Sequence, residues 1–168
     1  YCAEGDIDFV RKNRQFYKRC KQGPYNAVVG PNACYPGLFG IHYAVVYNKP
    51  EILKILFPYE EDMFTQDEII LPCDFPVSNQ IFKQMKQFQN CQKSFKNFIV
   101  VPKSSSFLQI AIMLGRWDLF NQFSMFCSNQ VLTHKNSIGQ TILDCLIRFQ
   151  NHFSIKIKGN EQAIYQLL

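Results

Sequence analysis

Three histidines and one run of acidic side chains are the residues of this chain whose types could do chemistry. Histidine can act as a general base near neutral pH or as a metal ligand. His42 lies in an apolar segment and is the strongest candidate for a base. His134 and His152 lie in polar segments with no acid or thiol at metal-ligand spacing, so we interpret both as surface residues.

The acidic run consists of residues 60–62 followed by Asp67 and Glu68. Clustered carboxylates suit Ca²⁺, but the spacing does not fit the calcium-binding loop and no glycine is present for its turn. We therefore expect a solvated stretch. The glycine-rich phosphate-binding, dinucleotide-binding and nucleophile-elbow patterns are also absent from the sequence. The sequence predicts no catalytic, cofactor-binding or metal-binding residue, and an enzyme of unrecognised type is only the third alternative.

Cysteine is the remaining reactive residue type. The odd number of cysteines and the absence of a C-x-x-C pair argue against a disulfide framework and against a zinc or redox site. Several fall inside apolar helical patterns, where a free cysteine behaves as a small hydrophobic residue. We expect reduced, buried thiols in a cytoplasmic protein. The seven cysteines are Cys2, Cys20, Cys34, Cys73, Cys91, Cys127 and Cys145.

Basic residues gather between positions 11 and 21, interleaved with Phe16 and Tyr17, and a second set spans residues 83–96. Cations that contact phosphates and aromatic rings that stack on bases form nucleic-acid surfaces. The simpler interpretation is the solvated face of amphipathic helices, because the formal net charge is only +5. Binding of nucleic acid or an acidic membrane surface is therefore the second alternative.

A chain of 168 residues, 47% of them apolar, is long enough to bury one core and predicts a single domain. Its longest nearly apolar stretch, residues 38–47, is interrupted by Gly40 and His42. A membrane-spanning helix needs roughly 20 consecutive apolar residues. The sequence therefore predicts no transmembrane segment.

The segment around His42 predicts a tight helical hairpin. Apolar residues at three- and four-residue steps predict a short helix over residues 41–45. Asn48 tolerates the left-handed conformation that ends a helix, and Pro50 suits the first position of the next. The second helix spans residues 51–57, and Pro58 should stop it. Such short helices are marginal alone, so the hairpin must stack on neighbours.

The same pattern recurs along the chain. Residues 106–123 have a joint at Gly115, 67 residues after Asn48, and residues 139–150 place Gln150 at a joint 35 residues later. Gly5 is predicted to be the joint of a further hairpin, of which the sequence contains the second helix and little of the first. These steps suggest one period.

This period and pattern resemble the ankyrin repeat, a unit of about 33 residues with a β-turn, two antiparallel helices and the signature T-P-L-H-x-A. Residues 39–44 carry the His and Ala of that signature, and residues 106–111 carry its Leu and Ala. Gln109 and Asp144 replace the family histidine, and Gln150 replaces the joint glycine. The resemblance implies that the ring of His42 makes structural hydrogen bonds instead of acting as a base.

The expected fold is therefore all-α: an ankyrin-like solenoid of stacked helix-turn-helix repeats with irregular insertions, forming one domain over residues 1–168. Residues 81–100 show a helical pattern inside the insertion, whereas Pro72 and Pro76 favour irregular structure before it. Residues 21–37 predict an enlarged loop, residues 151–160 a short strand or loop, and residues 162–168 a final helix. The predicted units are a partial repeat at 1–20, a repeat at 34–58, an insertion or degenerate repeat at 59–103, a repeat at 104–135 and a repeat with an inserted loop at 136–168.

The resemblance implies a non-catalytic scaffold or adaptor that binds another protein of unknown identity, without a cofactor, through its concave face. The runner-up is a basic helical module that binds RNA, a ribonucleoprotein particle or an acidic membrane surface. The helical members of the predicted face are apolar, and two alternatives stay open: they form an exposed patch, or residues 59–103 fold over them. The predicted partner-binding residues are Tyr35, Leu38, Val46, Tyr47, Lys103, Met113, Leu114, Ile138, Arg148 and Phe149.

Overall fold

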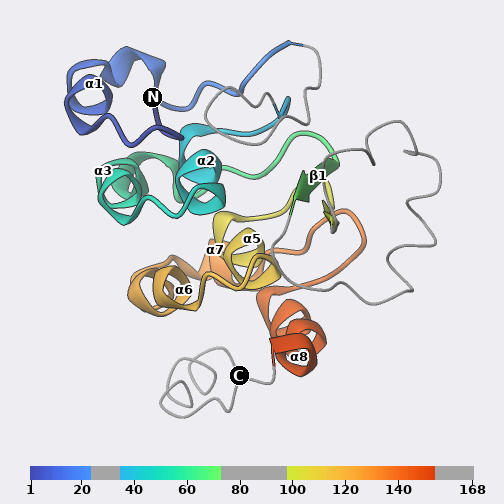
Figure 1. Cartoon of the computed structure of the whole chain (residues 1–168). Coiled ribbons are helices and arrows are strands. Elements are labelled where there is room, and N and C mark those ends of the chain that lie inside the picture. The colour runs from blue at the N-terminus through green and yellow to red at the C-terminus, as the bar shows by residue number, and fades with distance from the viewer. Residues whose placement is uncertain (24–34, 73–97, 154–168) are drawn as a thin grey trace.

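The computed structural model describes residues 1–23, 35–72 and 98–153, and these build two layers of helices with a small sheet beside them (Figure 1). In the first layer α2 packs on α5 and α5 packs on α8, while in the second α1 packs on α3. The hairpin partners α2 and α3, and α5 and α6, join the layers. The helices are α1 (Ile7–Lys12), η1 (Arg14–Phe16), α2 (Gly40–Val46), α3 (Pro50–Glu60), α5 (Phe107–Met113), α6 (Trp117–Ser124), α7 (Asn129–Thr133) and α8 (Ile142–Phe153).

The two predicted joints at Asn48 and Gly115 are confirmed. Both residues have left-handed backbones, with φ of 53° and 65°. At Asn48, its N–H donates to the carbonyl of Val45 at 3.1 Å, and the Lys49 N–H donates to that of Ala44 at 2.7 Å. The same two bonds recur around Gly115. This pattern satisfies the last carbonyls of a helix and reverses the chain, which explains why each hairpin turns within three residues.

Substitution of Asn48 tests this explanation. Asn48→Ala should lower the free energy of unfolding by about 1 kcal/mol, because a Cβ without a compensating polar group disfavours the left-handed backbone. Asn48→Gly should be as stable as the unmodified chain or slightly more stable. Urea unfolding followed by circular dichroism measures both. Equal stability of the alanine and glycine variants would contradict the explanation.

The first helix of each hairpin, α2 or α5, begins with the same pair of side-chain hydrogen bonds. The Nδ1 of His42 accepts from the Phe39 N–H at 3.1 Å, and its Nε2 lies 3.2 Å from the Met63 carbonyl oxygen. Gln109 does the same for α5: its Oε1 accepts from the Ser106 N–H at 2.9 Å, and its Nε2 donates to a carbonyl before α8 at 2.7 Å. The structural role of His42 is confirmed, because both ring nitrogens face backbone groups.

The predicted all-α class is wrong, because the described residues include an antiparallel sheet of two strands, β1 (Ile69–Pro72) and β2 (Phe98–Val101). Ile69 pairs with Val101, and the register continues to Pro72 opposite Phe98. Ile69, Leu71, Ile99 and Val101 are buried, and β-branched residues favour this pleated packing. The fold is a mixture of helices and a sheet and not the predicted solenoid. Residues 98–100 are strand and not helix, while residues 81–97 lie outside the described residues.

Two predicted helix ends are also wrong. α3 runs past Pro58 to Glu60, since a proline near the end of a helix removes only one hydrogen bond. α8 runs without interruption from Ile142 to Phe153, so Gln150 is not a joint and residues 151–153 are not a strand or loop. Glutamine is a good helix former and supplies no left-handed turn. The predicted helix at 162–168 lies outside the described residues.

Residues 1–23, named here the N-terminal arm, fold back over the first hairpin. Gly5, with φ of 87°, forms the predicted joint before α1. The Lys21 N–H donates to the carbonyl of Leu38 at 2.8 Å, and the Gly37 N–H donates to that of Lys21 at 3.1 Å. These bonds close the base of the predicted loop at 21–37, most of which lies outside the described residues. The arm therefore packs beside α2 and α3.

The core continues from Val10 in the arm to Phe149 in α8. Within residues 1–23, 35–72 and 98–153, each helix is too short or too polar to cross a bilayer.

Candidate functional site: a groove between the N-terminal arm and the first hairpin

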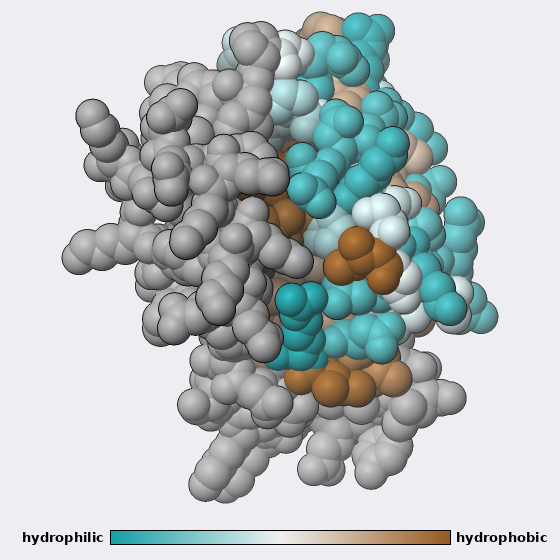
Figure 2. Space-filling model, turned by 90° about the vertical axis from the view of Figure 1, so that its right-hand side faces the viewer, coloured by the Kyte–Doolittle hydropathy of each residue, from teal (hydrophilic) through white to brown (hydrophobic). Residues whose placement is uncertain are grey.

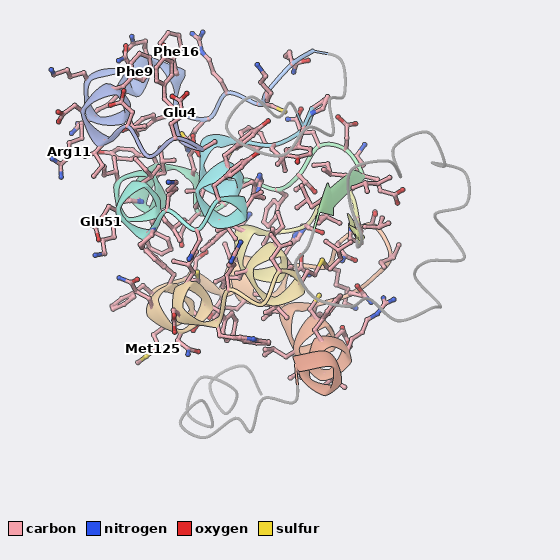
Figure 3. All side chains as sticks on the ribbon, in the orientation of Figure 1. Glu4, Phe9, Arg11, Phe16, Glu51 and Met125 are labelled. Carbon is pink, nitrogen blue, oxygen red and sulfur yellow. The ribbon has the colours of Figure 1, made fainter. Side chains whose placement is uncertain are left out.

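An open groove of about 600 Å³ lies between the N-terminal arm and the α2–α3 hairpin. Figure 3 places Phe9 and Phe16 at this end of the molecule, away from Met125 beyond α6. The volume falls in the range of sites that bind ligands or peptide side chains. The groove is lined by Tyr1, Cys2, Ala3, Phe9, Val10, Asn13, Phe16, Tyr17, Arg19, Cys20, Lys21, Gln22, Leu38, Phe39, Gly40, Tyr43, Leu56 and Glu60.

Glu60 holds the walls of the groove together. Its side chain is 1% exposed, and its Oε1 accepts a hydrogen bond from the Lys18 N–H at 2.7 Å. Its Oε2 accepts from the Ile41 N–H, in the first turn of α2, at 2.8 Å. A Cβ at Gly40 would lie 3.2 Å from this oxygen and 3.0 Å from Leu56. One carboxylate thus joins the arm, α2 and α3, and a Cβ at Gly40 would sit tightly against it.

Opposing effects act on the charge of Glu60. Burial raises the pKa of this carboxyl, while the hydrogen bonds from Lys18 and Ile41 lower it. The backbone of Lys18 is left-handed, with φ of 59°, which turns its N–H toward the carboxylate. Both oxygens of Glu60 are therefore engaged, and the carboxylate serves as a structural acceptor.

The sequence interpretation missed Glu60, because it grouped this residue with the solvated acidic run. The signal was available in the helical period: Glu60 follows Leu56 by four residues and Ile52 by eight, on the buried face of α3. The assignment failed because Pro58 was taken as the end of the helix, which left residue 60 outside it.

The aromatic rings beside the groove are packed against one another and against arginines. Tyr1 stacks on Phe9 with ring centroids 3.5 Å apart, and the Arg19 guanidinium lies 5.3 Å from the centre of the Phe16 ring. Arg14 covers the Tyr59 ring at 5.8 Å. The basic and aromatic residues that are close in the sequence also lie close in space, where their side chains pack on one another.

Two thiols, Cys2 and Cys20, also line the groove, and neither forms a disulfide. Burial raises the pKa of Cys2 to about 11, and burial likewise raises those of Cys127 and Cys145 to about 12. Thiolates are the reactive form, so these cysteines are poor nucleophiles near neutral pH.

Alkylation should reveal the raised pKa of Cys2. At pH 8 we expect iodoacetamide to modify Cys2 at least about tenfold more slowly than a free cysteine, with the rate rising about tenfold per pH unit toward pH 11. Peptide mass spectrometry assigns the modified residue. The same chain in guanidinium chloride is the control and should react like free cysteine. Fast modification of Cys2 in the folded chain would contradict its burial.

The structure separates the predicted partner-binding residues into three groups. The five buried residues belong to the core, so their side chains do not offer a surface to a partner. Tyr35, Leu38, Met113, Leu114 and Phe149 are buried, Val46 and Tyr47 are half-buried, and Lys103, Ile138 and Arg148 are exposed. Of the two alternatives left open by the sequence, the exposed patch does not hold for Met113, Leu114 and Phe149, which are buried. The described surface in Figure 2 is mostly hydrophilic with separate small apolar patches.

Four of these residues do meet. Met113, Ile138, Arg148 and Phe149 line a pocket of about 220 Å³ beside β2. The Arg148 guanidinium lies 5.9 Å from the centre of the Phe149 ring. Of the other six, Leu38 lines the large groove, and the rest line neither hollow.

Ser104 and His134 form a serine–histidine contact that lies outside both the groove and the smaller pocket. The Nε2 of His134 lies 3.0 Å from the Oγ of Ser104 and 2.9 Å from its carbonyl oxygen. Because a carbonyl oxygen only accepts, the shorter contact places the proton on Nε2, which then cannot take a proton from the hydroxyl. The ring also stacks on Phe64 at 3.6 Å. His134 is half-buried and joins two loops through these contacts, a role that the interpretation as a surface residue did not include.

Comparison with known proteins finds no matching family model, curated protein or solved structure. The resemblance to ankyrin repeats and the cytoplasmic location therefore stay predictions. Over the three described stretches, no three His, Cys, Asp or Glu side chains are placed so that they could share a metal ion.

Proposed function

We propose that this chain is a non-catalytic protein-interaction module, of the scaffold or adaptor kind, that binds a segment of another protein in the N-terminal groove. The observation that carries the proposal is the groove itself: about 600 Å³, open to solvent, with apolar walls and a few polar groups. Interfaces use such concave sites to bury anchoring side chains. Glu60 fixes the walls through two backbone hydrogen bonds, which keeps the site formed before a partner arrives.

The packing of the arm favours a protein partner over a nucleic acid. Single-stranded nucleic acids stack on free aromatic faces. An arginine already lies over one face of Phe16 and of Tyr59. Glu4, Asp6 and Asp8 are exposed on the arm outside the groove and would repel a phosphate backbone that extends beyond it.

Photo-crosslinking tests the proposal. Benzoylphenylalanine replaces Phe16, which lines the groove and is 49% exposed, or Phe126, which is 72% exposed and lies outside it. Irradiation in a lysate of the source cells should give discrete, nuclease-resistant protein adducts from position 16. Position 126 is the matched control and should give few. Adducts from position 126 alone, or adducts removed by nuclease, would refute the proposal.

A further inference from the structure

We infer that the partner segment is acidic, with a bulky apolar anchor flanked by Asp or Glu; this inference rests on the proposed function and names the chemistry of its partner. The charged side chains that line the groove indicate this chemistry. Arg19 and Lys21 are both exposed and both positive. Glu60 is the one carboxylate among the described lining residues, and it is buried with both oxygens bonded to backbone N–H groups. Among the described residues, the exposed charged side chains that line the groove are therefore all cationic.

The arrangement of the cations suits carboxylates. The guanidinium of Arg19 lies over the Phe16 ring, 5.3 Å from its centre. A guanidinium on an aromatic face can still pair with a carboxylate through its N–H groups. Lys21 is held in place by its backbone, through the bonds to Leu38 and Gly37. Arg14 and Lys18 are exposed on the same part of the arm and extend the positive potential. Complementary charge of this kind selects partners and speeds their association.

The apolar walls supply a place for an anchor. Val10, Leu38 and Leu56 form the floor, and the ring of Phe16 stands at the rim, half-exposed. The acids of the arm, Glu4 and Asp8, do not line the groove and so do not oppose an acidic ligand inside it. An acidic segment with a Trp, Phe or Leu side chain matches both the charge and the apolar floor.

The test uses a display library of random 12-residue peptides, selected against the whole chain, followed by fluorescence anisotropy of the enriched peptides. We expect enriched sequences to carry an aromatic or aliphatic residue beside Asp or Glu. Arg19→Glu with Lys21→Glu should weaken their binding at least tenfold. Lys103→Glu with Lys135→Glu is the matched control, since both lysines are exposed outside the groove, and should change binding less than twofold. Thermal unfolding confirms that each variant is folded, and Lys21→Glu alone, which leaves the Arg19–Phe16 contact intact, should still weaken binding severalfold.

The outcomes separate the inference from the proposed function. Enriched peptides that are basic or uncharged, yet block cross-linking from position 16, would overturn the acidic chemistry and leave the groove as the site. The inference would also be overturned if Arg19→Glu with Lys21→Glu did not weaken the binding of any enriched peptide, or if no peptide were enriched. A concentration-dependent dimer in analytical ultracentrifugation, abolished by the same reversal, would identify a second copy of this chain as the occupant and reject a separate acidic partner. If position 16 gave no protein adducts beyond those of position 126, the proposed function itself would be refuted.

Discussion

Glu60→Ala should lower the free energy of unfolding by about 3 kcal/mol, the largest single effect we expect in this chain. The substitution leaves the N–H groups of Lys18 and Ile41 without their acceptor and opens a cavity beside Leu56. Glu60→Gln keeps the volume but offers one acceptor oxygen to two donors, so we expect an intermediate loss of about 1.5 kcal/mol. Urea unfolding measures all three chains.

Glu61 provides the matched control for this prediction. It is the next residue along, it is only half-buried, and its carboxylate makes a longer contact of 3.4 Å with the Ser128 N–H. Glu61→Ala should cost less than about 1 kcal/mol. Hydrogen exchange at the Lys18 and Ile41 amides should speed up in the Glu60 variants and not in the Glu61 variant. Equal losses for the two glutamates would contradict the role given to Glu60.

His42→Gln should remove most of the loss of stability in acid. Complete burial lowers the pKa of His42 from 6.5 to about 3, so the folded chain keeps this ring neutral while the unfolded chain binds a proton below pH 6.5. A lowered pKa in the folded state therefore makes stability fall as the pH drops. The contribution is about 1.4 kcal/mol per pH unit, or about 2.5 kcal/mol between pH 6 and pH 4.

Gln109 is the reason for choosing glutamine. It makes at α5 the bonds that His42 makes at α2, so His42→Gln should lose only about 1 kcal/mol at pH 7. The raised pKa of Glu60 acts in the opposite direction, since it adds stability as the pH falls toward 4.5, but this contribution is common to both chains and cancels in the difference. Urea midpoints from pH 7 to pH 4 measure the effect. His134→Gln is the control and should keep the acid dependence that His42 causes; a His42→Gln chain with unchanged acid dependence would contradict the assignment.

The parts of the fold that the sequence predicted correctly are those with local causes. Asn48 and Gly115 end helices because of their own backbone preferences, and Gly5 acts in the same way before α1. Gln150 was placed at a joint from the repeat period alone, with no residue there that stops a helix, and α8 runs through it. A repeat period alone does not predict the end of a helix unless the residue at that position also favours a turn.

The sheet depends on contacts that the sequence does not display locally. Ile69 pairs with Val101, more than thirty residues away, and each strand has only four residues. Short apolar runs cannot be assigned to helix or strand by period alone. The predicted helix over residues 81–100 therefore included Ile99, which lies in β2.

The groove has the same non-local origin. It forms where the arm meets residues 38–60, and the bond that joins them links Lys18 to Glu60, 42 residues apart. The sequence identified the basic and aromatic residues of the arm but could not place them beside this hairpin. The predicted binding residues followed the ankyrin register instead, and five of the ten are core positions.

Amide chemical-shift mapping with the most strongly enriched peptide shows whether the groove is the binding site. We expect the shifted amides of the ¹⁵N-labelled chain to lie at residues 9–22, 38–43 and 56–60, which surround the groove. Shifts confined to residues 99–113 and 138–149, around the smaller pocket, would contradict this expectation.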